Sequence, residues 1–127
     1  MKRVTVLLAA GLILLAATVL PTIRAGAQAT VVTDDNLEQM IANAKAPADH
    51  EAIAAYFEQE AADARKKADL HRHAAETYRK MRISKPVGMA EMCDGIAATW
   101  DKGAADAQNL AKMHHEMAKK AAATTGQ

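Results

Sequence analysis

The hydrophobic positions of this chain follow helical spacing from about residue 36 almost to its end. A first amphipathic face consists of four residues at i, i+3, i+4 and i+7, which are Leu37, Met40, Ile41 and Ala44. The sequence Ala-Pro-Ala at 46–48 interrupts this pattern, and we expect Asp49 to cap a second helix that continues without Gly or Pro to about Met81. The pattern therefore predicts a short helix followed by a long one.

A third helix is predicted after a turn over residues 82–87. Pro86 disfavours helical geometry at Lys85, so the second helix ends before it. Helical spacing resumes at Gly88 or Met89 and continues to about Ala122, and residues 124–127 form a C-terminal tail. Every predicted element is a helix, so the predicted fold class is all-α.

The two long helices are related by an internal repeat with a shift of 43 residues. Residues 50–75 align with residues 93–118 without a gap, and ten of the 26 pairs are identical. Seven of these ten are Ala matches in an Ala-rich chain, so the polar and aromatic matches carry more weight. These matches are Asp63 with Asp106, His71 with His114, and Phe57 with Trp100.

Each repeat carries a stripe of mostly Ala residues with alternating spacings of four and three. In the first repeat the stripe is His50, Ala54, Phe57, Ala61, Ala64, Ala68, His71, Ala75 and Tyr78. In the second it is Cys93, Ala97, Trp100, Ala104, Ala107, Ala111, His114, Ala118 and Ala121. This spacing is typical of the seam of a left-handed helix pair, and Ala lets two helix axes approach closely.

A short turn between two helices makes them antiparallel. We therefore expect one long helical hairpin over residues 49–123, in which one repeat's aromatic residue faces the other repeat's histidine. In this register Phe57 faces His114 and Trp100 faces His71. The N-terminal tail and short helix of residues 30–48 do not cover the whole hairpin, so we expect two copies to pair into a four-helix bundle. The apolar residues that remain partly uncovered are Ile53, Tyr56, Leu70, Ile96 and Leu110.

Residues 1–29 have the order of a secretory signal peptide. Two basic residues precede an uncharged apolar run over residues 4–20, which is followed by a proline and two Ala-x-Ala sites. Cleavage after Ala27 or Ala29 would place the mature protein in the periplasm or outside the cell, without stable membrane insertion. An uncleaved membrane anchor is the alternative, because the apolar run is 17 residues long.

Charge and size narrow the classes of function. Removing residues 1–29 takes away three basic residues and no acidic ones, which changes the net charge from +1 to −2. This charge argues against a nucleic-acid partner. About 98 residues remain, enough for one domain with a modest core. Cys93 is the only cysteine, so no internal disulfide compensates for that modest core.

Sulfur and imidazole side chains form two candidate metal sites, one at each end of the hairpin. Thioether, thiolate and imidazole ligands together select Cu(I), and an exported protein works where a cell meets copper. The candidate ligands are Met89, Met92 and Cys93 near the turn, and His114, His115 and Met117 at the opposite end, where His50 lies on the facing helix. The competing interpretation is that these side chains fill the helical core, since no paired CxxC or HExxH spacing occurs in the sequence.

Other chemistries have less support. Covalent haem needs Cys-x-x-Cys-His, which the sequence lacks, and a non-covalent haem between Met40 and His114 finds little room beside the Ala seam. The predicted register separates Cys93 from His71 by about 9 Å along the axis, too far for a catalytic pair. A basic cluster at the turn complements the helix dipole, with an anionic partner as the alternative; it consists of Arg79, Lys80, Arg82 and Lys85.

The sequence thus predicts a non-enzymatic helical scaffold or protein-interaction module of the bacterial cell envelope, without a cofactor. Its expected partner is a second copy of the chain or another envelope protein. The alternative function is a periplasmic copper carrier or buffer that uses the Met, His and Cys residues named above.

Overall fold

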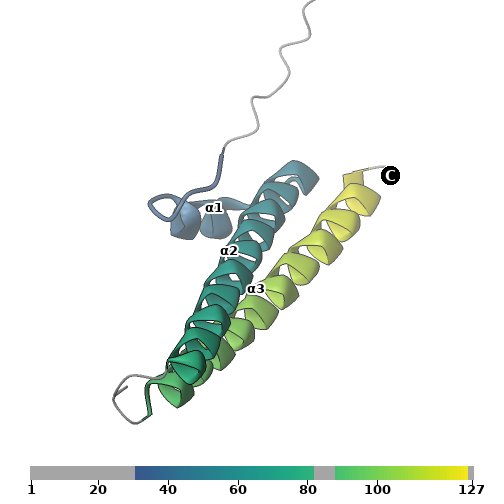
Figure 1. The fold of residues 1–127 in the computed structure, drawn as a ribbon. Coiled ribbons are helices and arrows are strands. Elements are labelled where there is room, and N and C mark those ends of the chain that lie inside the picture. The colour runs from purple at the N-terminus through teal and green to yellow at the C-terminus, as the bar shows by residue number, and fades with distance from the viewer. Residues whose placement is uncertain (1–30, 82–87, 126–127) are drawn as a thin grey trace, which may run out of the picture.

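The computed structural model describes residues 31–81 and 88–125, and within these ranges it contains three helices and no strand (Figure 1). Helix α1 spans Leu37–Asn43, α2 spans Pro47–Lys80 and α3 spans Met89–Thr125. The predicted all-α class is thereby confirmed. The predicted signal peptide and the predicted turn over 82–87 lie outside the described residues. None of the described helices is long and apolar enough to cross a membrane.

Helix α2 begins three residues earlier than predicted, because its N-cap is Ala46 and not Asp49. Pro47 is its first residue, where a missing N–H costs nothing, and Ala46 is the N-cap. Asp49 is therefore not the cap, and that prediction was wrong. The Asp49 carboxylate instead accepts hydrogen bonds from the backbone N–H groups of Lys45 and Ala46 at 3.0 and 2.8 Å, which is half of a capping box. These two bonds lower the pKa of Asp49.

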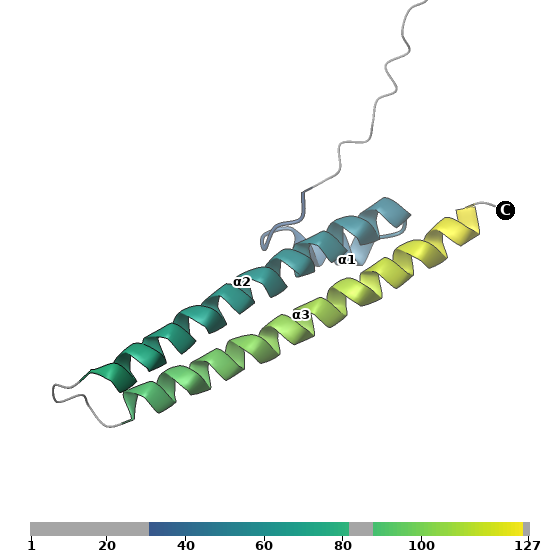
Figure 2. The same cartoon turned by 45° about the vertical axis from the view of Figure 1, so that its right-hand side comes forward.

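Helices α2 and α3 lie side by side along most of their length in both views (Figures 1 and 2). They run antiparallel, because each contact between them joins a late residue of one helix to an early residue of the other. Arg79 at the end of α2 contacts Asp94 at the start of α3, whereas Glu58 near the start of α2 contacts His115 near the end of α3. The described ends of the pair are called here the turn end, near Arg79, and the open end, near His115.

The core between α2 and α3 consists almost entirely of Ala. Ten alanines are less than a tenth exposed: Ala54, Ala61, Ala64, Ala68, Ala75, Ala90, Ala97, Ala104, Ala111 and Ala118. Ile53 is the only large side chain among the described residues that is fully buried. A methyl group removes little apolar area from water, so this seam stabilises the pair less per residue than a Leu-rich seam would, and helix propensity contributes more.

Helix α1 lies beside the N-terminal part of α2 (Figures 1 and 2). The hydroxyl of Tyr56 donates a hydrogen bond to Asp34 at 2.8 Å, which fastens the segment before α1 to α2. Ile53 lies one turn earlier on the same face of α2 and is fully buried, whereas Ile96, its counterpart in the second repeat, is only half-buried. Helix α1 therefore makes the surroundings of the two repeats unequal.

Candidate functional site

One edge of the helix pair carries a ladder of polar contacts, one heptad apart on both helices. Its four rungs are Arg79 with Asp94, Arg72 with Asp101, Arg65 with Gln108, and Glu58 with His115. Each ladder residue directly follows a seam residue, which places all of them on the same edge. Nearly half of the Arg72 side chain and of the Asp101 side chain is exposed, so such ion pairs add little to the free energy of unfolding. Their main effect is to fix how α2 and α3 are aligned along their axes.

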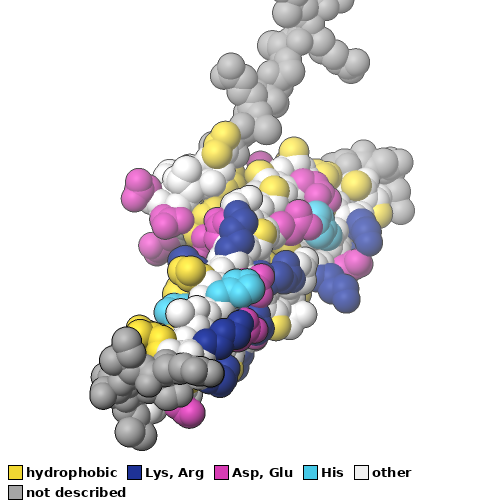
Figure 3. Space-filling model, viewed as in Figure 1, with side chains coloured by type: hydrophobic (Ala, Val, Ile, Leu, Met, Phe, Trp, Pro, Cys, Tyr) yellow, Lys and Arg dark blue, Asp and Glu magenta, His cyan; other side chains and the backbone are white. Residues whose placement is uncertain are grey.

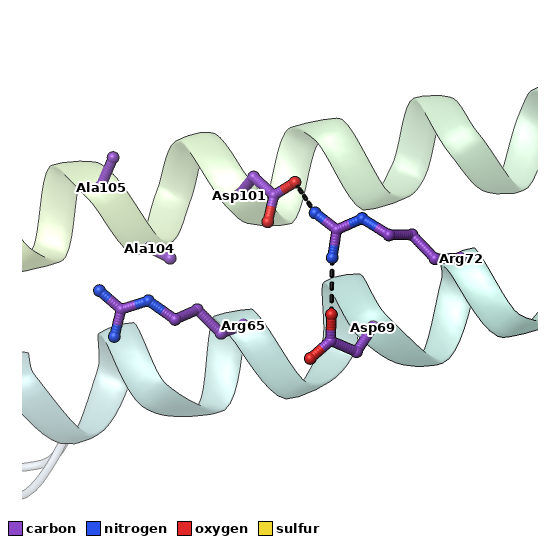
Figure 4. A pocket seen from close by; sticks show the side chains of 6 residues that line it. All are labelled: Arg65, Asp69, Arg72, Asp101, Ala104 and Ala105. Atoms are coloured by element: carbon purple, nitrogen blue, oxygen red, sulfur yellow. Dashed lines mark hydrogen bonds and ion pairs between the residues drawn. The ribbon is translucent and has the colours of Figure 1, made fainter.

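An open groove of about 300 Å³ lies beside the Ala seam at the middle of this ladder (Figure 4). Arg65 and Arg72 reach toward it from α2, and Ala104 lines it on α3. Arg72 bonds to Asp69 on its own helix at 2.7 Å and also to Asp101 on α3. Because two carboxylates already neutralise Arg72, the groove is poorly suited to an anionic ligand.

Two histidines face each other across the pair at the open end. The Nδ1 atoms of His50 and His114 are 3.3 Å apart, and their ring centroids are 5.6 Å apart. Phe57 stacks on His114 with 6.0 Å between ring centroids, which confirms the contact expected from the seam. His114 is only 9% exposed. This burial, together with the nearby His50, lowers the pKa of His114, so its imidazole is neutral at pH 7.

The adjacent His115 has the opposite environment. Its Nδ1 lies 2.8 Å from a carboxylate oxygen of Glu51, and its Nε2 lies 3.1 Å from one of Glu58. These two hydrogen bonds, first that of Glu58 and then that of Glu51, raise the pKa of His115. Carboxylates of α2 engage both ring nitrogens of His115, so His115 links the two helices.

The six sequence-predicted metal ligands lie in two sets, with Met89, Met92 and Cys93 at the turn end and His114, His115 and Met117 at the open end. Among residues 31–81 and 88–125, no three His, Cys, Asp or Glu side chains are close enough together to hold a metal ion. Met92 and Met117 are 68% and 43% exposed, and Met89 and Cys93 are half-buried. The structure brings His114 to His50, which the sequence placed on the facing helix at the same end of the pair.

An exposed apolar stripe runs along α3 on the other edge of the pair. Leu110, Met113 and Met117 are 41%, 57% and 43% exposed and follow one another at i, i+3 and i+7. Leu110 and Met117 directly precede seam residues, so this stripe lies on the edge opposite the polar ladder. Gly103, one heptad before Leu110, has open space where a Cβ would lie.

Comparisons with family models, with curated proteins and with solved structures find no match to this chain. Its function therefore has to be inferred from its own side chains. Three features are available for that purpose: the polar ladder, the histidine cluster of the open end, and the apolar stripe of α3.

Proposed function

We propose that the protein is an exported, non-enzymatic scaffold of the bacterial cell envelope, a helical hairpin that binds a second copy of itself and forms a four-helix bundle. The observation that carries the proposal is the exposed stripe of Leu110, Met113 and Met117. Large apolar side chains gathered on one exposed edge are typical of a protein-binding surface. Burying them would add the apolar contact area that an Ala seam supplies only sparingly.

A second copy of the chain is well matched to this stripe. If two α3 helices cross antiparallel about a two-fold axis near Asp106, Leu110 of one copy lies opposite Gly103 of the other, and Met117 lies opposite Ile96. The open space at Gly103 would accommodate the Leu110 side chain. Asp106 is already paired with Lys102 at 2.7 Å, which reduces the repulsion between the two copies at the axis. A two-fold axis makes each of these contacts twice.

Charge supports a protein partner over a nucleic acid. The chain without residues 1–29 has a net charge of −2. Acidic and basic side chains are interspersed over the face of the molecule in Figure 3, whereas a nucleic-acid surface is mainly basic. Export is supported by the charged, apolar and small-residue order of residues 1–29. The alternative function, a periplasmic copper carrier or buffer, would use Met89, Met92 and Cys93 at the turn end or His114, His115 and Met117 at the open end.

Sedimentation equilibrium of the mature protein tests the proposal. The wild type is expected to be a dimer at tens of micromolar, and Met113→Glu is expected to be a monomer, because a carboxylate in the interface would lose its hydration. Gln108→Glu is the matched control, since it introduces the same charge on the ladder edge of α3, opposite the apolar stripe, and should leave the dimer intact. A wild type that stays monomeric across the concentration range would contradict the proposal.

A further inference from the structure

The two imidazoles of the open end come from different helices and converge in the interior of the pair. Nδ1 of His50 and Nδ1 of His114 are separated by 3.3 Å and face each other. Two imidazole nitrogens that bind one zinc ion at 2.0–2.1 Å with a tetrahedral angle are about 3.3 Å apart. The observed separation therefore matches the one that an ion requires.

The geometry points to a metal site in which His50 and His114 bind one first-row divalent ion of the Zn(II) class through their Nδ1 atoms. Water fills the remaining positions of the tetrahedron. His50 is half-exposed, so the ion can reach the site from solvent, whereas His114 is buried and held in place by the stacked ring of Phe57. The buried His114 is held in position and His50 is reached by solvent, so the site is formed before the ion binds and remains accessible to it.

A hydrogen bond between two neutral imidazoles has the same length, so the surroundings matter as much as the distance. Glu51 and Glu58 flank His115 at 2.8 and 3.1 Å beside the pair. Glu51 and Glu58 supply two carboxylates beside the one imidazole of His115, and Lys119 offsets part of their charge by its interaction with Glu51. The acidic groups next to the pair still favour a cation nearby. These carboxylates also occupy both nitrogens of His115, so the ion is bound by His50 and His114 alone.

Binding requires a rearrangement of one proton. In the empty pair, one Nδ1 carries the hydrogen that is donated to the other Nδ1. When the ion binds, the donor ring loses that proton from Nδ1 and takes one up at Nε2 from solvent. Both rings thus remain neutral, and both Nδ1 lone pairs are directed at the ion. No net proton is released from the pair.

The internal repeat supplies a natural control for this site. It aligns His50 with Cys93 and His114 with His71, so a thiol and an imidazole occupy the equivalent seam positions. Zinc also binds thiolates, and an experiment has to distinguish the two positions. Cys93→Ser removes the thiol without touching the open end, and His73→Ala removes an exposed imidazole of α2.

The test is a titration of the metal-free mature protein with Zn(II) in the presence of a chromophoric competitor. One ion per chain is expected in the wild type, in Cys93→Ser and in His73→Ala. His50→Ala and His114→Gln should each weaken zinc affinity by at least about tenfold. Loss of a residue that only hydrogen-bonds to a metal ligand already lowers affinity by about that factor, and loss of the ligand itself should lower it no less. Zinc should also raise the melting temperature of the wild type but not that of His50→Ala.

His50 is half-exposed, so His50→Ala keeps the test valid even if His114→Gln does not fold. Circular dichroism checks the helix content of each variant. The site would be refuted by the absence of saturable binding, by unchanged affinity in folded His50→Ala, or by loss of binding in Cys93→Ser.

Discussion

Arg79 on α2 pairs with Asp94 on α3, and the same contact recurs one heptad further from the turn end between Arg72 and Asp101. The contacts recur every seven residues on both helices, so each one fits the same helix register. At the open end the acidic residue is on α2 and the basic one on α3, where Glu58 contacts His115. A slip of one heptad that moved Arg65 opposite His115 would place two basic groups together. The ladder therefore selects one register for a seam whose repeated Ala residues would tolerate several.

The ladder predicts that charge reversal at one rung is rescued across the pair. Arg72→Asp should lower the urea midpoint of unfolding, because two carboxylates then face each other across the seam edge. Adding Asp101→Arg should restore most of the loss by re-forming the pair with opposite polarity. Asp101→Arg should not rescue Lys112→Asp, which lies outside the ladder, and equal rescue of both variants would show that only net charge matters.

The seam predicts strong overpacking at its centre. Ala68 is fully buried between α2 and α3, so Ala68→Leu has no space for its added carbons and should cost about 1–3 kcal/mol of unfolding free energy. Ala98→Leu, on the exposed side of α3, should change stability little. The measurement is chemical denaturation followed by circular dichroism. Equal unfolding curves for both variants would contradict close packing of the seam.

The unequal burial of the repeat counterparts predicts unequal costs of truncation. Ile53→Ala removes a fully buried side chain and should cost about 2–5 kcal/mol. Ile96→Ala, the same change at a half-buried position, should cost less. The comparison controls for side-chain chemistry and helix propensity, since both are identical. A larger effect at Ile96 would mean that α1 does not shield Ile53 in solution.

The hydrogen bond from Tyr56 to Asp34 predicts a displaced tyrosine titration. This bond, aided by burial, raises the pKa of Tyr56 to about 12, because ionised Tyr56 would lose its bond and face a carboxylate. Asp34→Ala should move the pKa back toward 10.0. Phenolate absorbance in a Tyr78→Phe background reports Tyr56 alone among the two tyrosines. An unchanged titration after Asp34→Ala would show that the N-terminal segment is detached.

The two adjacent histidines predict opposite dependences of stability on pH. The pKa of His115 is raised on folding, so its stabilising contribution is fully present below its ordinary value of 6.5 and is lost as the pH rises through the raised value. The pKa of His114 is lowered, so the folded state resists its protonation and stability decreases as the pH falls below 6.5. The two effects oppose each other during mild acidification.

His115→Gln isolates the contribution of His114. With a chelator present, this variant should lose more stability than the wild type between about pH 7.5 and 5.5, measured as the urea midpoint. His114→Gln should show the reverse, with stability gained over the same interval. Parallel profiles for the wild type and both variants would mean that neither histidine is linked to folding.

The helices and the Phe57–His114 contact could be predicted from the sequence because they depend on periodicity. Helical spacing identifies each element, and a seam joined by a short turn brings one repeat's aromatic residue near the other's histidine. The sequence placed His50 on the helix that faces His114, but the direct contact between their Nδ1 atoms could not be predicted in the same way. It requires the axial stagger and side-chain rotamers of both helices, and spacing along one helix reports only which face a residue occupies.

The exposure of Leu110 was predicted from the sequence, whereas Ile53, which was also expected to be partly uncovered, is fully buried. Both residues directly precede seam residues, so position along one helix does not distinguish them. Asp49 shows the same limit on a smaller scale. Its type is suited to capping, but whether Pro47 lies before or within the helix depends on how the preceding segment enters α2.

The position of α1 affects how many copies of the chain can bind to one molecule. A structure with two equivalent open sides could accept a neighbour on each and grow into a filament. Helix α1 lies beside the first repeat, where Ile53 is buried, whereas the equivalent Ile96 of the second repeat is only half-buried. The molecule would therefore offer one binding surface for a second copy instead of two. The short helix would then set the valency of the assembly, and its removal would be the change that converts a closed dimer into a polymer.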